Sequence, residues 1–190
     1  MTMWRVAPAV LFGAALMGCG NGSSGSAPVG SGAPAAGNSG APQAAAANGK
    51  TVHQKLTKDE CTFEFDAPEA LKPGKEDGMS IDANGASFEM MVYAGASLYG
   101  LDQLAGLTLM GTKDTVLVKE TANNINLVVT RSEKPPSDPN KFIGGHGEEA
   151  NPGDRQLGCS YLCWGPKEKE AETVAMCKSV RIQYKKAAEK

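Results

Sequence analysis

The sequence predicts a domain of the α+β class, in which an antiparallel β-sheet carries two packed helices and disulfides staple the fold. Segments in which apolar and polar residues alternate are spread between residues 61 and 164, as expected for half-buried strands. Helical spacing of apolar residues occurs twice, at 98–107 and after residue 165. Four cysteines accompany these segments, from Cys61 to Cys177. This mixture of elements favours helices packed on one antiparallel sheet.

The first half of the predicted domain contains two strands, a helix and a hairpin. Residues 61–66 and 87–93 each alternate between apolar and polar side chains, which predicts two half-buried strands. Leucines recur at helical spacing over 98–107, which predicts an amphipathic helix. Residues 115–120 and 125–131 are rich in β-branched residues and flank a short polar turn, so we expect them to pair as a hairpin.

The second half is predicted to hold a loop, a strand and a helix. Residues 133–156 contain four prolines, four glycines and several charges, which predicts a long surface loop. Residues 158–164 have the composition of a final strand. Gly165-Pro166 then begins a helix that we expect to reach about Ile182, since proline is tolerated at a helix start.

The charged residues show where this domain begins. The chain has 190 residues and a formal net charge of −2. All 21 acidic residues lie at or beyond Asp59, and one basic residue, Arg5, precedes Lys50. Residues 50–190 are therefore predicted to form a single domain, long enough to bury a core. The domain lacks a basic stripe, so we expect no nucleic-acid partner.

The order of elements resembles that of a known family. The matching parts are Phe63 to Pro68 (Phe-Glu-Phe-Asp-Ala-Pro), the central hairpin, and the closing helix with Lys178-Ser179-Val180-Arg181. They resemble PsbP-like domains, α/β/α sandwiches that include the Mog-type Ran-binding proteins and many small bacterial lipoproteins. The resemblance covers most of residues 58–184. It implies a sandwich fold that binds other proteins or assists complex assembly, and few members of the family are enzymes.

Residues 1–18 have the layout of a signal peptide. Arg5 gives a positively charged start, and residues 6–17 are almost wholly apolar. This apolar run is too short to cross a bilayer as a helix, which takes about 20 residues.

The run ends in Leu16-Met17-Gly18-Cys19, which resembles the lipobox of bacterial lipoproteins. The resemblance implies cleavage between Gly18 and Cys19, with diacylglycerol on the thiol of Cys19 and an acyl chain such as palmitate on its new amino group. The protein would then be held in a membrane by the acylated Cys19. The alternative is an ordinary secretory signal with an incidental cysteine.

Residues 20–49 are predicted to be a disordered linker between the lipidated Cys19 and the domain. They consist of Gly, Ala, Ser, Pro, Asn, Gln and Val29, with no charged or aromatic residue. A flexible chain of this length reaches roughly 30 Å. Gly20 stands where enteric-type sorting places Asp for retention in the inner membrane. This pattern favours the outer membrane of the cell envelope.

The four remaining cysteines predict two disulfides, because an exported protein meets an oxidising compartment. If the last helix starts at Pro166, Cys177 lies about 15 Å along it, which is level with Cys159 on the preceding strand. This favours the pairs Cys159–Cys177 and Cys61–Cys163, with the other two connectivities open. Zinc binding and thiol exchange are less favoured, because the spacing is scattered and no Cys-x-x-Cys occurs.

No set of residues predicts catalysis. His146 lies near Glu148 and Glu149, a setting in which a histidine can bind a metal or act as a base, but we expect a solvated loop tip. Ser160 and Ser179 lack a readable His and Asp partner. We therefore predict no catalytic, cofactor-binding or metal-binding residue, and no enzyme activity.

These features together predict a membrane-anchored envelope lipoprotein that carries a non-catalytic module for binding a protein partner. The alternative is a carrier of a small or lipidic ligand, for which a concave apolar pocket is required.

Overall fold

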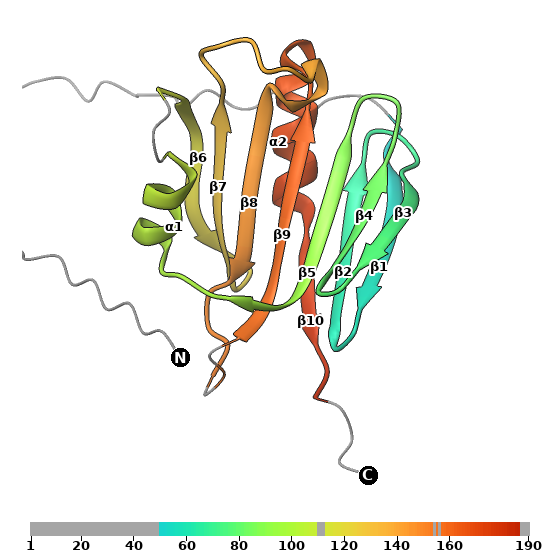
Figure 1. Ribbon diagram of the computed structural model, residues 1–190, viewed down its shortest axis with the longest axis vertical. Helices are drawn as coiled ribbons and strands as arrows, with labels where there is room; N and C mark the ends of the chain where they lie inside the picture. Colours follow the sequence, from blue (N-terminus) through green and yellow to red (C-terminus); the bar gives the residue numbers. More distant parts are fainter. Residues whose placement is uncertain (1–49, 110–112, 154, 156, 187–190) are drawn as a thin grey trace, which may run out of the picture. The chain divides into compact units, whose positions relative to one another are not determined.

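A seven-stranded antiparallel sheet forms the centre of the domain (Figure 1). The computed structural model describes residues 50–109, 113–153, 155 and 157–186. The strands of the large sheet follow the order β3-β4-β5-β9-β8-β7-β6. Their bounds are β3 (Lys72–Asp77), β4 (Ser80–Asn84), β5 (Glu89–Ser97), β6 (Thr115–Ala122), β7 (Ile125–Arg131), β8 (Ile143–Glu149) and β9 (Leu157–Gly165). The expected α+β class, with an antiparallel sheet and two helices, is thus confirmed.

A second, smaller sheet packs beside the large one. It contains β1 (Val52–Lys58), β2 (Cys61–Ala67) and β10 (Arg181–Tyr184) in the order β1-β2-β10. β1 and β2 form a hairpin that contacts β4 and β5. The last strand, β10, therefore pairs with β2, which is the first of the strands predicted from the sequence.

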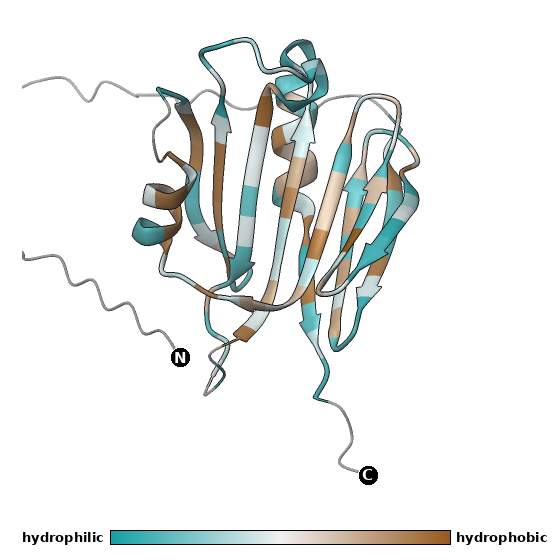
Figure 2. Ribbon diagram, viewed as in Figure 1, coloured by the Kyte–Doolittle hydropathy of each residue, from teal (hydrophilic) through white to brown (hydrophobic). Residues whose placement is uncertain are grey.

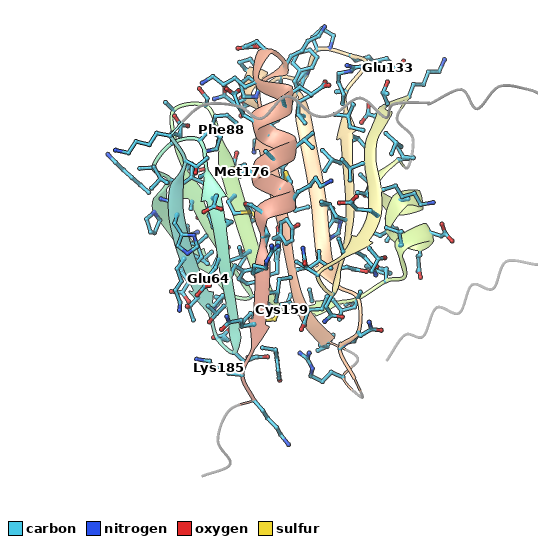
Figure 3. All side chains as sticks on the ribbon, turned by 180° about the vertical axis from the view of Figure 1, so that it is seen from behind. Glu64, Phe88, Glu133, Cys159, Met176 and Lys185 are labelled. Atoms are coloured by element: carbon cyan, nitrogen blue, oxygen red, sulfur yellow. A yellow bond between two sulfur atoms is a disulfide. The ribbon has the colours of Figure 1, made fainter. Side chains whose placement is uncertain are left out.

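The two helices lie on opposite faces of the large sheet (Figures 1 and 3). α1 (Leu101–Thr108) packs on β6 and β7, where Leu104 covers Val128. α2 (Glu170–Ser179) packs on β8, β9 and β2, and Figure 3 shows it in front of the large sheet. Two short 3-10 turns, η1 (Pro139–Lys141) and η2 (Lys167–Lys169), precede β8 and α2.

The main core lies between the large sheet, the small sheet and α2. Its largest fully buried side chains include Tyr161, Phe63, Phe65, Met90 and Met176. β7 is buried on both faces, because α1 covers the side opposite this core. Figure 2 shows the run of hydrophobic residues along β7. Both faces of β7 are therefore fixed by packing.

Residues 133–156 are not the long loop that their composition predicted. They contain β8, which pairs with β7 and β9 near the middle of the sheet. A Cβ atom on Gly145 would lie 2.5 Å from Sγ of Cys163, and one on Gly147 would overlap the ring of Tyr161. Glycines therefore replace apolar residues on this strand because α2, a disulfide and Tyr161 occupy the space of its side chains.

The last predicted helix is shorter than expected. α2 begins at Glu170 and ends at Ser179, and residues 181–184 leave it to pair with β2 as β10. The strands β1, β3 and β4 were not expected either. β3 is fully exposed, so it carries no apolar pattern that identifies a strand.

The four cysteines of the domain form two disulfides, but the expected pairing is wrong. Cys61 bonds Cys159, with their Cα atoms 5.8 Å apart, and Cys163 bonds Cys177, at 5.9 Å. Because η2 delays the start of α2, Cys177 lies only about 10 Å along the helix, which brings it level with Cys163. Cys159 at the far end of β9 then meets Cys61, the first residue of β2.

Candidate functional site

One face of the large sheet is only partly covered, and we call it the open face. α1 covers β6 and β7 there, whereas within the described residues no helix packs on the outward side chains of β4, β5, β9 and β8. The open face comprises Asp82 of β4, Glu89, Met91 and Tyr93 of β5, Leu162 and Trp164 of β9, and Gly144 and His146 of β8. Each of these residues is half-buried.

The register of the strands sets these side chains in rows across the sheet. His146 stands opposite Leu162, Leu162 opposite Met91, and Met91 opposite Asp82. In the neighbouring row, Trp164 lies between Gly144 and Glu89. The open face thus presents a continuous band of apolar and aromatic side chains with carboxylates at its margin.

Trp164 is held in place by its neighbours. A Cβ atom on Gly144 would lie 3.4 Å from Cδ1 of Trp164, an ordinary van der Waals distance, so the indole lies directly beside this glycine. Nζ of Lys141 lies 4.7 Å from the centre of the Trp164 ring and 2.9 Å from Oε2 of Glu89. A cation over an indole face is a favourable contact, and here its charge is also balanced by a carboxylate.

A pocket of about 310 Å³ lies between the end of α1 and the open face. Its floor is formed by His146 and Leu162 together with Thr130 of β7, and Trp164, Phe142 and Asp114 are among its other lining residues. We call it the His146 pocket. Leu107, Phe142, Leu162 and Trp164 give it apolar surface, and most of its other lining residues are polar.

Several polar groups in this pocket have unused hydrogen-bonding capacity. Within the described part of the chain, the side chains of His146, Asp114 and Thr130 make no hydrogen bond or ion pair, although each is buried or half-buried. Burial lowers the pKa of His146 below its usual 6.5, so the imidazole is neutral at pH 7. His146 therefore lies on a strand beside a pocket, and the expectation of a solvated loop tip is wrong.

Glu148 lies on the same face of β8 but is fully buried beneath the connection from β5 to α1. Its Oε1 accepts a hydrogen bond of 2.8 Å from the backbone N–H of Tyr99, and Nδ2 of Asn126 donates to the carbonyl of Tyr99 at 3.3 Å. Burial raises the pKa of Glu148 to about 7. Together the two side chains hold the backbone directly before α1.

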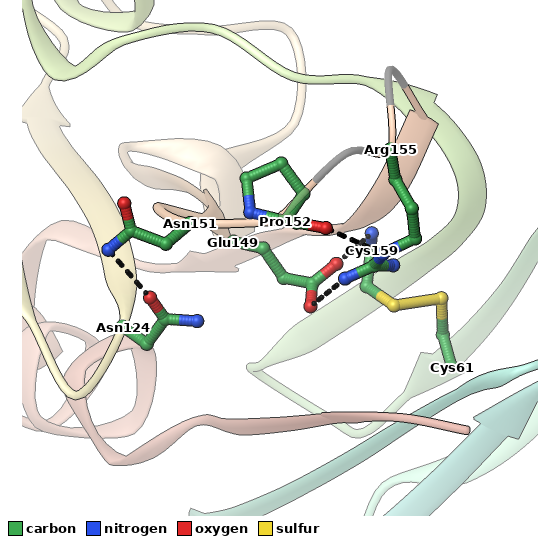
Figure 4. A network of polar contacts seen from close by, with 7 residues as sticks. All are labelled: Cys61, Asn124, Glu149, Asn151, Pro152, Arg155 and Cys159. Atoms are coloured by element: carbon green, nitrogen blue, oxygen red, sulfur yellow. Dashed lines mark hydrogen bonds and ion pairs between the residues drawn. A yellow bond between two sulfur atoms is a disulfide. The ribbon is translucent and has the colours of Figure 1, made fainter. Parts of the chain in front are cut away.

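Glu149 points to the other face of β8 and belongs to a structural network (Figure 4). Its Oε2 accepts from the backbone N–H of Cys159 at 2.9 Å, and its Oε1 lies 3.0 Å from a guanidinium nitrogen of Arg155. That guanidinium also stacks on Tyr184, with its carbon 3.5 Å from the ring centre. The network fastens the β8–β9 connection beside the Cys61–Cys159 disulfide, and within the described residues Nη1 of Arg155 is buried without a hydrogen-bond partner.

A second pocket, of about 370 Å³, lies beside α2 and offers less to a ligand. Phe88 and Met176 on its floor are 2% and 1% exposed. Glu69 accepts from the backbone N–H groups of Ser87 and Phe88, and Lys169 donates to the hydroxyl of Ser87. Because its apolar floor is covered and these polar groups are already bonded, we place the candidate site on the open face.

The residues predicted from the sequence are only partly brought together. Cys19 and Gly18 lie outside the described residues, and the four other cysteines are fully buried as disulfides on the core side. In the described ranges no three His, Cys, Asp or Glu side chains gather as a metal site, and no helix is long and apolar enough to cross a membrane. The open face was missed, although the alternation of residues 158–164 places Leu162 and Trp164 opposite the cysteines.

Comparison with known proteins does not assign the chain to a family. No protein-family model matches the sequence, and no curated protein is significantly similar to it.

Proposed function

We propose that this protein is a lipid-anchored protein of the bacterial cell envelope, whose domain binds a protein partner through the open face. The domain is a non-catalytic module of PsbP-like type. Its signal peptide is removed before Cys19, and the acylated Cys19 anchors it through the linker, with the outer membrane as the favoured location. The proposal for the anchor is supported by the lipobox-like sequence, and that for the domain by the open face.

The observation that carries the binding function is the band of half-buried Met91, Leu162 and Trp164 beside the His146 pocket. Tryptophan, tyrosine and methionine are enriched in protein interfaces, and tryptophan often contributes a large share of the binding energy. A half-buried aromatic residue held by its neighbours also loses little conformational freedom on binding. The polar groups of the pocket that have no partner within the described residues supply the hydrogen bonds that give such an interface its specificity.

Site-specific photo-crosslinking in cells tests this proposal. A photoreactive residue is placed at Leu162 or Met91 on the open face, or at Lys55 on β1 as the control, in the full-length chain. We expect one and the same protein to be captured from both open-face positions and not from Lys55. Capture from all three positions alike, or from Lys55 alone, would contradict an interface on the open face.

The anchor is tested in the same strains with Cys19→Ser. We expect this variant to keep its signal peptide, which gives a larger product, and to incorporate no labelled palmitate. If the wild-type protein and Cys19→Ser both have the normal size and neither incorporates labelled palmitate, the signal is an ordinary secretory one. If the crosslinks fail but native mass spectrometry of the purified protein shows a bound small molecule, the function is that of a carrier.

A further inference from the structure

We propose that the His146 pocket binds a basic side chain of the protein partner, with Asp114 as its counter-ion. This inference rests on the proposed function and specifies the chemistry of the partner. A guanidinium or ammonium group would reach Asp114, and its aliphatic stem would lie along the apolar wall of the pocket.

Among its hydrogen-bonding groups the pocket has three oxygens that act as acceptors. The hydroxyl of Thr108 donates to the carbonyl of Leu104 at 2.8 Å, and that of Ser132 donates to the carbonyl of Lys134 at 2.9 Å. Both oxygens have therefore used their hydrogen and retain lone pairs toward the pocket. The carboxylate of Asp114 is an acceptor only and has no partner within the described residues. These three oxygens suit a ligand group with several N–H donors, and the indole of Trp164 and the imidazole of His146 lie among the other lining groups.

The charges favour a cation. Lys141 also lines the pocket, but Glu89 neutralises it at 2.9 Å and the ring of Trp164 holds it in place. His146 is neutral at pH 7 because burial lowers its pKa. Asp114 is thus left as the unbalanced charge among the lining residues, and a half-buried carboxylate gains more from a cation than an exposed one does.

The two aromatic rings of the pocket each have a lysine beside them already, which leaves Asp114 as the partner for an incoming cation. Nζ of Lys141 occupies the Trp164 ring at 4.7 Å, and Nζ of Lys167 lies 5.6 Å from the centre of Phe142. The apolar wall left for a stem is formed by Leu107, which is 41% exposed, and Leu162. With a volume of about 310 Å³, the pocket is at the small end of ligand sites, which suits one side chain better than a whole cofactor.

The test uses the purified full-length protein in detergent, labelled with 15N-tryptophan and followed through the indole N–H of Trp164. The probes are N-acetyl-arginine amide, its neutral isostere N-acetyl-citrulline amide, and N-acetyl-norleucine amide. We expect the arginine probe to shift the Trp164 signal, with an affinity roughly fivefold higher than that of the citrulline probe. Equal binding of the two probes, or no shift of Trp164 with arginine, would overturn the proposal.

Asp114→Asn is the decisive variant, and Glu133→Gln is its matched control. Both remove one negative charge from the same edge of the domain, but Glu133 does not line the pocket and accepts from the hydroxyl of Thr115. We expect Asp114→Asn to abolish the preference for arginine and Glu133→Gln to retain it. If the preference survives in Asp114→Asn, Asp114 is not the counter-ion. If the Leu162 crosslinks to a partner are seen but the arginine probe does not bind, this inference alone is wrong. If neither the crosslinks nor arginine binding is seen, the proposed function is wrong as well.

Discussion

Single residues on β8 illustrate how one strand serves two surfaces. On the core side the strand carries Gly145 and Gly147, which leave room for the Cys163–Cys177 disulfide and for Tyr161. On the opposite side it carries His146 at the pocket and Glu148 beneath the start of α1. His146 and Glu148 therefore lie where a pocket and a backbone segment meet the sheet. The pKa of Glu148 depends on its burial there.

We expect Glu148→Gln to stabilise the protein at alkaline pH. The folded-state pKa of about 7 exceeds the ordinary glutamate value of 4.5, so wild-type stability is lost as the pH rises through this range. Glutamine resembles the protonated carboxyl and still accepts from the N–H of Tyr99. Since one pKa unit is about 1.4 kcal/mol, the variant should gain roughly 2–3 kcal/mol at pH 8 and nothing at pH 4. Urea unfolding at the two pH values measures this, and an equal effect at both would show that ionisation is not the cause.

At the scale of elements, prediction from sequence succeeded where periodicity was strong. β2, β5, α1, the β6–β7 hairpin and β9 all lie within a few residues of their predicted positions. β8 was missed because its glycines are required by contacts with residues distant in sequence. Judged by composition alone, a segment so rich in glycine resembles a loop. β10 was missed because Val180 continues the apolar pattern of α2. For the candidate site, alternation places Trp164 outward, but the approach of Asp114 from another loop depends on the tertiary fold.

The packing of α2 on β8 predicts different effects for two adjacent glycines. In Gly145→Ala the new methyl group would meet Sγ of Cys163 at 2.5 Å and Sγ of Cys177 at 2.9 Å, so we expect a loss of about 1–3 kcal/mol. Gly144→Ala is the matched control, because its methyl group meets only Trp164, at 3.4 Å on the open face. Thermal unfolding of both variants should show a clear drop for the first and a small change for the second. Similar melting temperatures would mean that α2 can move away from β8 at little cost.

At the scale of the whole molecule, β9 joins the separate layers covalently. One disulfide links it to β2 of the small sheet, and the other links it to α2. The first closes a sequence separation of 98 residues and the second one of 14. The longer closure spans most of the elements of the domain, whereas the shorter one spans the turn between β9 and α2.

We expect the two disulfides to contribute unequally to stability. In the chain-entropy model a loop of about 100 residues gives about 4.7 kcal/mol, and one of about 15 residues gives about 3 kcal/mol. Cys61→Ala/Cys159→Ala should therefore lose roughly 1.5 kcal/mol more than Cys163→Ala/Cys177→Ala, with all four cysteines equally buried. Denaturant unfolding of the two double variants checks the order. The reverse order would show that local packing of α2 outweighs the entropy of the unfolded chain.

The Cys61–Cys159 bond also determines how the domain would respond to mechanical load. A pull on the chain from its N-terminal side is applied first to β1, which pairs with β2 alone. Once β1 has peeled away, the force reaches Cys61 and passes through the sulfur bridge into β9 at the centre of the large sheet. Residues 62–158, which include the open face of β5 and β8, are bypassed by this path. This path spares the open-face side chains of β5 and β8 and enters β9, the strand that carries Leu162 and Trp164.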